Sequence, residues 1–318
     1  MESEAKIRIG ISACLLGERV RYDGGHKHDA FLTGTLGRFF EWVPVCPEVE
    51  LGLGTPRESI RLEGDPDNPR LVAPRSGKDH TEAMNRYAAK RLEKLAPLGL
   101  CGYILKKDSP SCGMARVRVY DERGMAARMG RGLFAGALMK RFPMLPVEEE
   151  GRLHDMTLRE NFIERVFALH RWREFLKGKP RAKDLVAFHT CQKLALMAHR
   201  PAHYQKLGRL VAGAGRAPLP ETLTTYGATF MEGLAMHATT RKHANVLYHL
   251  AGYLKDALDA GDKAELAECI EDYRAGRVPL IVPLTLLNHH FRRHPHPWVA
   301  GQTYLNPYPA ELMLRNHV

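Results

Sequence analysis

The chain has 318 residues, of which 44% are hydrophobic and 26% charged, so a disordered or fibrous protein is excluded and two domains are possible. Its longest apolar run, residues 278–287, is about half of the roughly 20 residues that a membrane-spanning helix needs. The acidic start MESEAKIRIG lacks the basic and apolar parts of a secretion signal, so we expect a cytoplasmic protein.

The net charge of +11 is unevenly divided along the chain. Residues 1–153 hold 25 basic and 21 acidic side chains, whereas residues 154–318 hold 22 and 15 together with 13 of the 16 histidines. A basic, histidine-rich half favours an anionic partner, with RNA or DNA ahead of an acidic membrane. A solvated basic surface without a partner would have the same composition.

The first 150 residues alternate strand-like with helix-like segments. Strand patterns cover residues 7–12, 42–45, 102–106, 116–120 and 144–147, and helical patterns cover residues 81–95 and 132–141. This alternation predicts an α/β domain over residues 1–153, built on a parallel sheet with helices on both faces. Residues 62–78 are rich in Pro, Asp and Gly, so we expect a loop or lid there.

The strand pattern stops at about residue 158 and helical periodicity takes over. It covers residues 161–176, 182–198, 204–212, 219–235, 241–260 and 263–275. Short turns marked by Gly or Pro separate these segments, as they do between antiparallel neighbours of a helical bundle. The sequence therefore predicts an all-α domain over residues 154–318.

Three of the six cysteines follow predicted strands. Cys14, Cys46 and Cys112 lie just beyond the first, second and third strands. Because the carboxyl ends of parallel strands meet at one edge of a sheet, we expect these three thiols to converge. Disulfides are rare in a reducing cytoplasm, so metal binding or catalysis is the better interpretation of such a cluster.

The other three cysteines are poor candidates for the same site. Cys101 precedes its strand, which places it at the opposite edge of the predicted sheet, well over 10 Å away at about 3.3 Å per residue. Cys191 and Cys269 fall in helical segments and are expected to be buried as small hydrophobic side chains.

Three thiolates are soft ligands that favour zinc, copper(I) or an iron-sulfur cluster over magnesium or calcium. A structural zinc ion normally has four protein ligands, often in closely spaced pairs, and no such pairs are present. Three ligands instead fit a site with one open position for a substrate. Residue spacing alone does not choose among these metals.

Side chains suited to proton transfer or substrate binding surround the predicted thiol site: Ser12, Asp23, Lys27, Glu48, Ser109 and Ser111. Glu48 is two residues beyond Cys46, where a carboxylate can act as general base toward a metal-bound substrate. The sequences YDGGHK and SPSC are also typical of turns, so the remaining side chains are weaker candidates.

The motifs IGISACLLG, VRYDGGHK, VCPEVELGLGTPRESIRL and LKKDSPSCG resemble the thiouracil desulfurase family, TudS, over about residues 6–150. From about residue 185 to the end, YQKLGRLVA, YRAGRVPLIVPLTLLNHH and PYPAELMLRNHV are similar to the YbgA-type helical domain. Fused proteins of this layout are associated with removal of sulfur from 4-thiouridine in tRNA.

The resemblance implies a 4Fe-4S cluster held by Cys14, Cys46 and Cys112, with the fourth iron free to take the substrate's sulfur. It further implies catalytic roles for Glu48 and Ser109. The expected activity is an iron-sulfur-dependent, non-redox desulfidase that hydrolyses a C–S bond, converting 4-thiouridine in tRNA to uridine and releasing hydrogen sulfide. No obligate protein partner is implied.

Three other functions remain open at this stage. A salvage desulfidase would act on free thiouracil or a thiouridine nucleotide and would not need the basic second half. A non-catalytic RNA-binding protein would use a structural metal, and a redox sensor would use a cluster without a substrate pocket. In the second half, Arg292 and Arg293 lie among four histidines in HHFRRHPHP, which we expect to contact RNA phosphates rather than a metal.

Overall fold

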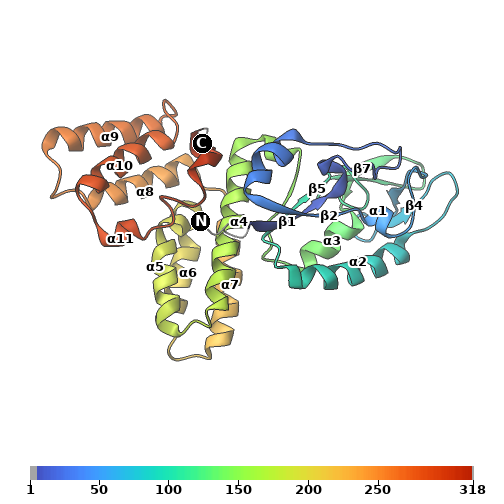
Figure 1. Ribbon diagram of the computed structural model, residues 1–318, viewed down its shortest axis with the longest axis horizontal. Coiled ribbons are helices and arrows are strands. Elements are labelled where there is room, and N and C mark those ends of the chain that lie inside the picture. The colour runs from blue at the N-terminus through green and yellow to red at the C-terminus, as the bar shows by residue number, and fades with distance from the viewer. Residues whose placement is uncertain (1–5, 317–318) are drawn as a thin grey trace. The chain divides into compact units, whose positions relative to one another are not determined.

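The chain forms two compact units, Met1–His154 and Asp155–Val318, each with its own hydrophobic core (Figure 1). The computed structural model describes residues 6–316. Residues 1–5 and 317–318 lie outside it, and with them half of the acidic N-terminal stretch and the last two residues of PYPAELMLRNHV. None of the helices in residues 6–316 is both long enough and apolar enough to cross a membrane.

A parallel four-stranded sheet forms the centre of the first unit. Its strands lie in the order β2-β1-β5-β8: β1 (Ile7–Ser12), β2 (Phe40–Val45), β5 (Gly102–Leu105) and β8 (Val147–Glu149). The central strand β5 is buried along its whole length, as expected for a sheet covered on both faces. Gly10 in β1 leaves room for the ring of Tyr103, since a Cβ atom there would lie 2.2 Å from that ring. The predicted parallel sheet is confirmed.

The two faces of this sheet are covered unequally. Helices α2 (Thr81–Leu95) and α3 (Leu133–Arg141) pack together on one side (Figure 1). The connection from β1 to β2 contributes short turns only: η1 (Ala13–Leu16), η2 (Phe31–Thr35) and η3 (Leu36–Arg38). The remaining short elements are α1 (Pro47–Glu50), η4 (Ala96–Leu98) and η5 (Arg152–His154). The predicted α/β class is therefore confirmed, with one face lacking full crossover helices.

A second sheet includes two short parts of the loop that the sequence predicted at residues 62–78. Its strands lie in the order β4-β3-β6-β7: β3 (Arg61–Glu63), β4 (Arg70–Val72), β6 (Val117–Tyr120) and β7 (Ala126–Gly130). Residues 64–69 and 73–78 are turns and loops as predicted, but β3 and β4 were missed because strands of three residues are too short for alternation to stand out beside the turn residues. Leu62 and Leu71 are nevertheless fully buried and anchor this hairpin.

The second unit is helical, as the sequence predicts. Its helices are α4 (Met156–Lys177), α5 (Ala182–His199), α6 (Pro201–Ala212), α7 (Leu219–Leu234), α8 (Thr240–Gly252), α9 (Ala260–Arg274), α10 (Ile281–Arg293) and α11 (Pro297–Ala300), followed by η6 (Ala310–Leu312) and η7 (Leu314–Asn316). Three details differ from expectation. Helix α10 covers residues 281–293, where the sequence predicts no helix. The predicted helix over residues 241–260 ends at Gly252, and Asp259 caps α9 by accepting a 2.8 Å bond from the Asp262 amide. Cys191 and Cys269 are partly exposed rather than buried.

A buried ion pair lies in the core of this helical unit. His199 donates from Nε2 to Glu164 at 3.0 Å and from Nδ1 to the carbonyl of Met236 at 2.6 Å. Burial alone would raise the pKa of Glu164, but the charge and the hydrogen bond of His199, together with the charge of Arg315, outweigh it and lower that pKa to about 2. Burial alone would lower the pKa of His199, but Glu164 raises it. Both groups are therefore charged near neutral pH.

We expect Glu164→Gln to lower the free energy of unfolding by about 3 kcal/mol near pH 5.5, because it leaves His199 buried without its counter-charge. The contribution of Glu164 is complete above its unfolded pKa of 4.5 and is lost as the pH falls toward 2. That of His199 is complete below 6.5 and is lost as the pH rises through its raised folded pKa. Urea denaturation across pH 2–9 measures the difference from wild type, which should shrink at both ends.

Glu174→Gln is the matched control, since Glu174 lies on the same helix and pairs with Lys177 on the exposed surface. Such a surface pair contributes little to stability. An equal, pH-independent loss in both variants would contradict the assigned buried pair.

Candidate active site

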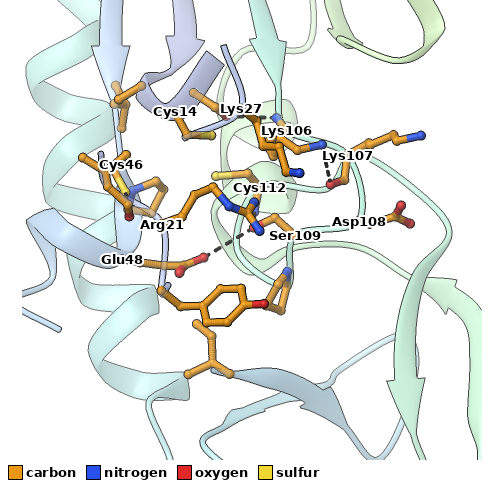
Figure 2. Close-up of a pocket in the computed structure, with 18 of the residues that line it drawn as sticks. Cys14, Arg21, Lys27, Cys46, Glu48, Lys106, Lys107, Asp108, Ser109 and Cys112 are labelled. Atoms are coloured by element: carbon orange, nitrogen blue, oxygen red, sulfur yellow. Dashed lines mark hydrogen bonds between the residues drawn. The ribbon is translucent and has the colours of Figure 1, made fainter. Parts of the chain in front are cut away.

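The three predicted thiols line one pocket of about 410 Å³ at the carboxyl edge of the parallel sheet. Cys14 lies in η1 directly after β1, Cys46 directly follows β2, and Cys112 lies in the loop after β5. Figure 2 shows them arranged around a common space with Glu48 and Ser109 below. Cys101 is not among the residues that line this pocket, and its thiol contacts the carbonyl of Gly99 instead.

Burial holds these thiols in their neutral form when no metal is bound. Cys14 and Cys112 are 8% and 5% exposed. Burial, with a smaller contribution from Cys46, raises the pKa of Cys14 to about 11. Burial, followed by the charges of Glu48 and the other two thiols, raises the pKa of Cys112 further. Deprotonating three neighbouring thiols here requires a cation to compensate, which is the usual condition of a metal-thiolate site.

Three thiols on one pocket are soft donors of the kind that hold an iron-sulfur cluster. Within residues 6–316, no three His, Cys, Asp or Glu side chains are grouped closely enough to hold one metal ion. In a cluster each thiolate binds a different iron, so the three sulfur atoms lie farther apart than around one ion, yet still close enough to influence each other's pKa. The donor set therefore agrees with the expected 4Fe-4S cofactor.

Glu48 is fixed in the pocket from both sides of its carboxylate. It lies in α1, the single turn that follows Cys46, with Pro47 at the first helical position. Its Oε1 accepts a 2.5 Å bond from Ser111 Oγ and a 3.4 Å bond from Ser109 Oγ. Its Oε2 accepts from Arg57 Nη2 at 2.5 Å and from Arg57 Nε at 3.2 Å. The carboxylate is thus oriented, and its side chain is only 14% exposed.

Arg57 is the principal site residue that sequence reasoning did not single out. Its guanidinium is 5% exposed and also donates to the carbonyls of Val20 and Gly54, at 3.0 and 2.8 Å. Arg57 therefore ties three loops together around Glu48. It stands within the quoted motif VCPEVELGLGTPRESIRL, nine residues beyond Glu48, where spacing gives no sign of contact.

The two serines of SPSC have different positions. Ser109 lines the pocket, and its Oγ accepts a 3.1 Å bond from the Cys112 amide. Ser111 is fully buried behind it, 3.0 Å from Ser109 Oγ, and does not line the pocket. The loop is held close to α3, because a Cβ atom on Gly132 would lie 2.5 Å from the Ser111 backbone. Ser109 can thus reach a substrate, whereas Ser111 contacts Glu48.

The other predicted substrate-binding residues are divided. Ser12 and Lys27 line the pocket, and Ser12 Oγ accepts a 2.9 Å bond from the Lys106 amide. Asp23 is exposed and lies outside the pocket lining. It accepts a 3.0 Å bond from the Gly25 amide and pairs with Arg21 at 3.5 Å. The turn chemistry of YDGG accounts for Asp23.

Comparison with known proteins assigns both units to families. A model described as 2-thiouracil desulfurase matches residues 9–150, and one described as a protein of unknown function (DUF1722) matches residues 193–309. The chain is 32% identical over 158 residues to the uncharacterized protein YbgA of Escherichia coli (strain K12), covering 49% of this chain and 94% of that protein. The chain belongs to the 2-thiouracil desulfurase family, with a YbgA-like region fused to it.

Two further proteins are similar to parts of this chain. The uncharacterized protein YbbK of Bacillus subtilis (strain 168) is 34% identical over 110 residues, which are 33% of this chain and 72% of that protein. A solved structure of the [4Fe-4S]-dependent thiouracil desulfidase TudS is 36% identical and covers 47% of this chain and 94% of that one, with a TM-score of 0.38.

Basic side chains form part of the wall of this desulfurase-family pocket. Arg21, Lys106 and Lys107 line it together with Lys27 and Arg57. Arg21 pairs with Asp23 and Lys106 pairs with Glu150. Within the described chain, Lys27 and Lys107 form no salt bridge, so both ammonium groups remain available to an anion. Of these cations only Lys27 is predicted from the sequence, because Lys106 and Lys107 precede the serines of SPSC without any distinctive spacing.

Proposed function

We propose that the chain is an iron-sulfur-dependent desulfidase that converts 4-thiouridine in tRNA to uridine and releases hydrogen sulfide. The observation that carries this proposal is the convergence of three thiols and an oriented carboxylate, Glu48, on one pocket at the sheet edge. Family membership supports the same chemistry, since the related TudS protein is a [4Fe-4S]-dependent thiouracil desulfidase.

Cys14, Cys46 and Cys112 are the proposed ligands of a 4Fe-4S cluster. When bound, such a cluster supplies a Lewis acid with one open coordination position, suited to the soft sulfur of a thiocarbonyl group. The remaining chemistry is a hydrolysis in which water replaces sulfur at C4 of the base. One C–O bond forms, one C–S bond breaks, and the two protons of water leave with sulfur as hydrogen sulfide. No electron is transferred.

Glu48 is the proposed general base. Its carboxylate is held by Arg57 and Ser111, so one oxygen can take a proton from water without the side chain rotating away. Ser109 faces the pocket and is the proposed donor of a hydrogen bond to the ring carbonyl or to the departing sulfur. The unpaired ammonium groups of Lys27 and Lys107 favour a substrate that carries phosphate over a free base.

The basic helical unit supports RNA as the form of substrate. Because Lys and Arg contacts to phosphates release counterions, we expect turnover of thiolated tRNA by the full-length protein to fall steeply with salt. Over a four-fold rise in salt, a protein with six or more phosphate contacts loses about 1,000-fold or more in affinity. Turnover of a free 4-thiouridine nucleotide, with few phosphates, should change far less.

The measurement is hydrogen sulfide release from both substrates across one salt series, at substrate concentrations below saturation. Turnover of the free nucleotide with no activity on tRNA would replace this proposal by the salvage desulfidase. Equal salt dependence for both substrates would mean that the helical unit does not recruit RNA.

A further inference from the structure

Four aromatic rings form a cluster on the helical unit, away from its core. His249 from α8, Tyr253 at the end of α8, and His296 and Trp298 at α11 make up this ring cluster. Tyr253 is its centre, with its ring centroid 5.5 Å from His249, 4.7 Å from His296 and 5.0 Å from Trp298. The Tyr253 and Trp298 rings are stacked, 25° from parallel. Two pairs of rings, from segments more than 40 residues apart in the chain, thus form one surface.

The ring cluster is open to solvent. Tyr253 is 37% exposed, His249 is exposed, and His296 and Trp298 are half-buried. In the described part of the chain, neither the hydroxyl of Tyr253 nor the indole N–H of Trp298 has a hydrogen-bond partner. Grouped aromatic side chains at a surface are unusual unless they bind something, because each exposed ring forgoes the favourable free energy that it would gain by burial in the core.

Another exposed tyrosine of α8 has a different environment. Tyr248 is 40% exposed, but its hydroxyl donates a 2.6 Å bond to Glu271. That carboxylate also pairs with Arg274 at 3.0 Å, so the polar edge of the Tyr248 ring is already engaged within the protein. Tyr248 is therefore an exposed tyrosine that lies outside the ring cluster, and it can serve as a control for Tyr253.

Positive charge accompanies the ring cluster. Lys255 follows Tyr253 by two residues, and Arg292 and Arg293 end α10 three to six residues before His296 and Trp298. All three cations are exposed and form no salt bridge within residues 6–316. Asp256 provides one negative charge beside Lys255, which leaves a positive excess. Aromatic faces with unpaired cations are the combination that binds single-stranded nucleic acid.

We propose that the ring cluster is a stacking platform for unstacked bases of single-stranded RNA, with Arg292 and Arg293 contacting the adjacent phosphates. This proposal rests on the proposed function, the action on tRNA, and adds the surface of the helical unit that binds the tRNA. Paired RNA does not suit the platform, because stacking within a duplex hides the faces of its bases. Loops and chain ends of an RNA supply such bases.

Fluorescence of Trp298 provides the direct test, using the full-length, cluster-loaded protein and a short oligouridylate. Of the three tryptophans, Trp172 is buried and Trp42 lies in β2 of the first unit, so quenching by a base stacked on the ring cluster should come from Trp298 and should disappear in Trp298→Phe. Tyr253→Ala should weaken binding of the oligouridylate about ten-fold or more. It should leave unchanged both the binding of a duplex RNA of equal length and the turnover of a free 4-thiouridine nucleotide.

Tyr248→Ala is the matched control and should bind the oligouridylate as wild type does. Arg292→Ala with Arg293→Ala should weaken single-stranded and duplex RNA alike. Equal affinity of the Tyr253→Ala and Tyr248→Ala proteins, while wild type still acts on tRNA, would overturn the platform but not the proposed function. Quenching by polyglutamate as strong as by oligouridylate would also overturn it. Absence of any RNA binding, with turnover of the free nucleotide intact, would overturn both.

Discussion

Alanine at Cys14, Cys46 or Cys112 is expected to abolish bound iron and sulfur removal together, whereas Cys101→Ala should spare both. The three thiols line one pocket, and a cluster that loses one of three protein ligands loses a third of the bonds that hold it to the protein. Cys101 is equally well buried, but it lies outside the pocket lining. Iron content and hydrogen sulfide release, measured on proteins prepared without oxygen, compare the four variants.

Cys101→Ala is the control, because it removes a buried thiol that lies outside the pocket lining. Circular dichroism of all four variants separates loss of the cofactor from loss of the fold. Full iron content with wild-type turnover in any of the three pocket variants would remove that cysteine from the ligand set.

Glu48→Gln is expected to keep the cluster and the fold but to lower turnover about 100-fold or more, the usual scale of general acid-base help. The amide preserves the shape and still accepts from Arg57 or Ser111, but it cannot take a proton from water. The loss should therefore appear in kcat rather than in substrate binding. Steady-state kinetics with a free 4-thiouridine nucleotide separates the two.

Glu50→Gln is the matched control on the same helical turn. Glu50 lies outside the pocket lining, where it accepts a 2.8 Å bond from the Tyr87 hydroxyl and pairs with Arg91 at 2.8 Å. This variant should turn over as wild type does. A Glu48→Gln protein with undiminished kcat would eliminate Glu48 as the base.

The parallel sheet could be predicted because its strands are bounded by clear turns and alternate with a helix of strong periodicity. The helix predicted over residues 81–95 has the same bounds as α2 (Thr81–Leu95). The second sheet could not, since three-residue strands such as β3 and β4 leave almost no periodic pattern. β3 pairs locally with β4, but it also pairs with β6, more than 50 residues farther along the chain.

The thiol site followed from one topological rule, that carboxyl ends of parallel strands share an edge. Cys14, Cys46 and Cys112 are brought together in this way, and Glu48 lies two residues beyond Cys46. Arg57 could not be predicted as a site residue, because its contact with Glu48 depends on the path of an irregular segment rather than on a strand end. Asp23 was predicted as a side chain for proton transfer or substrate binding, but its carboxylate accepts from the Gly25 amide and stabilises the turn of YDGG.

The iron and sulfide content of the full-length protein, prepared and reconstituted without oxygen, tests the central claim most directly. The account predicts about four iron and four sulfide ions per chain, as a 4Fe-4S cluster requires. One zinc ion per chain without sulfide, in protein that still releases hydrogen sulfide from 4-thiouridine, would contradict it.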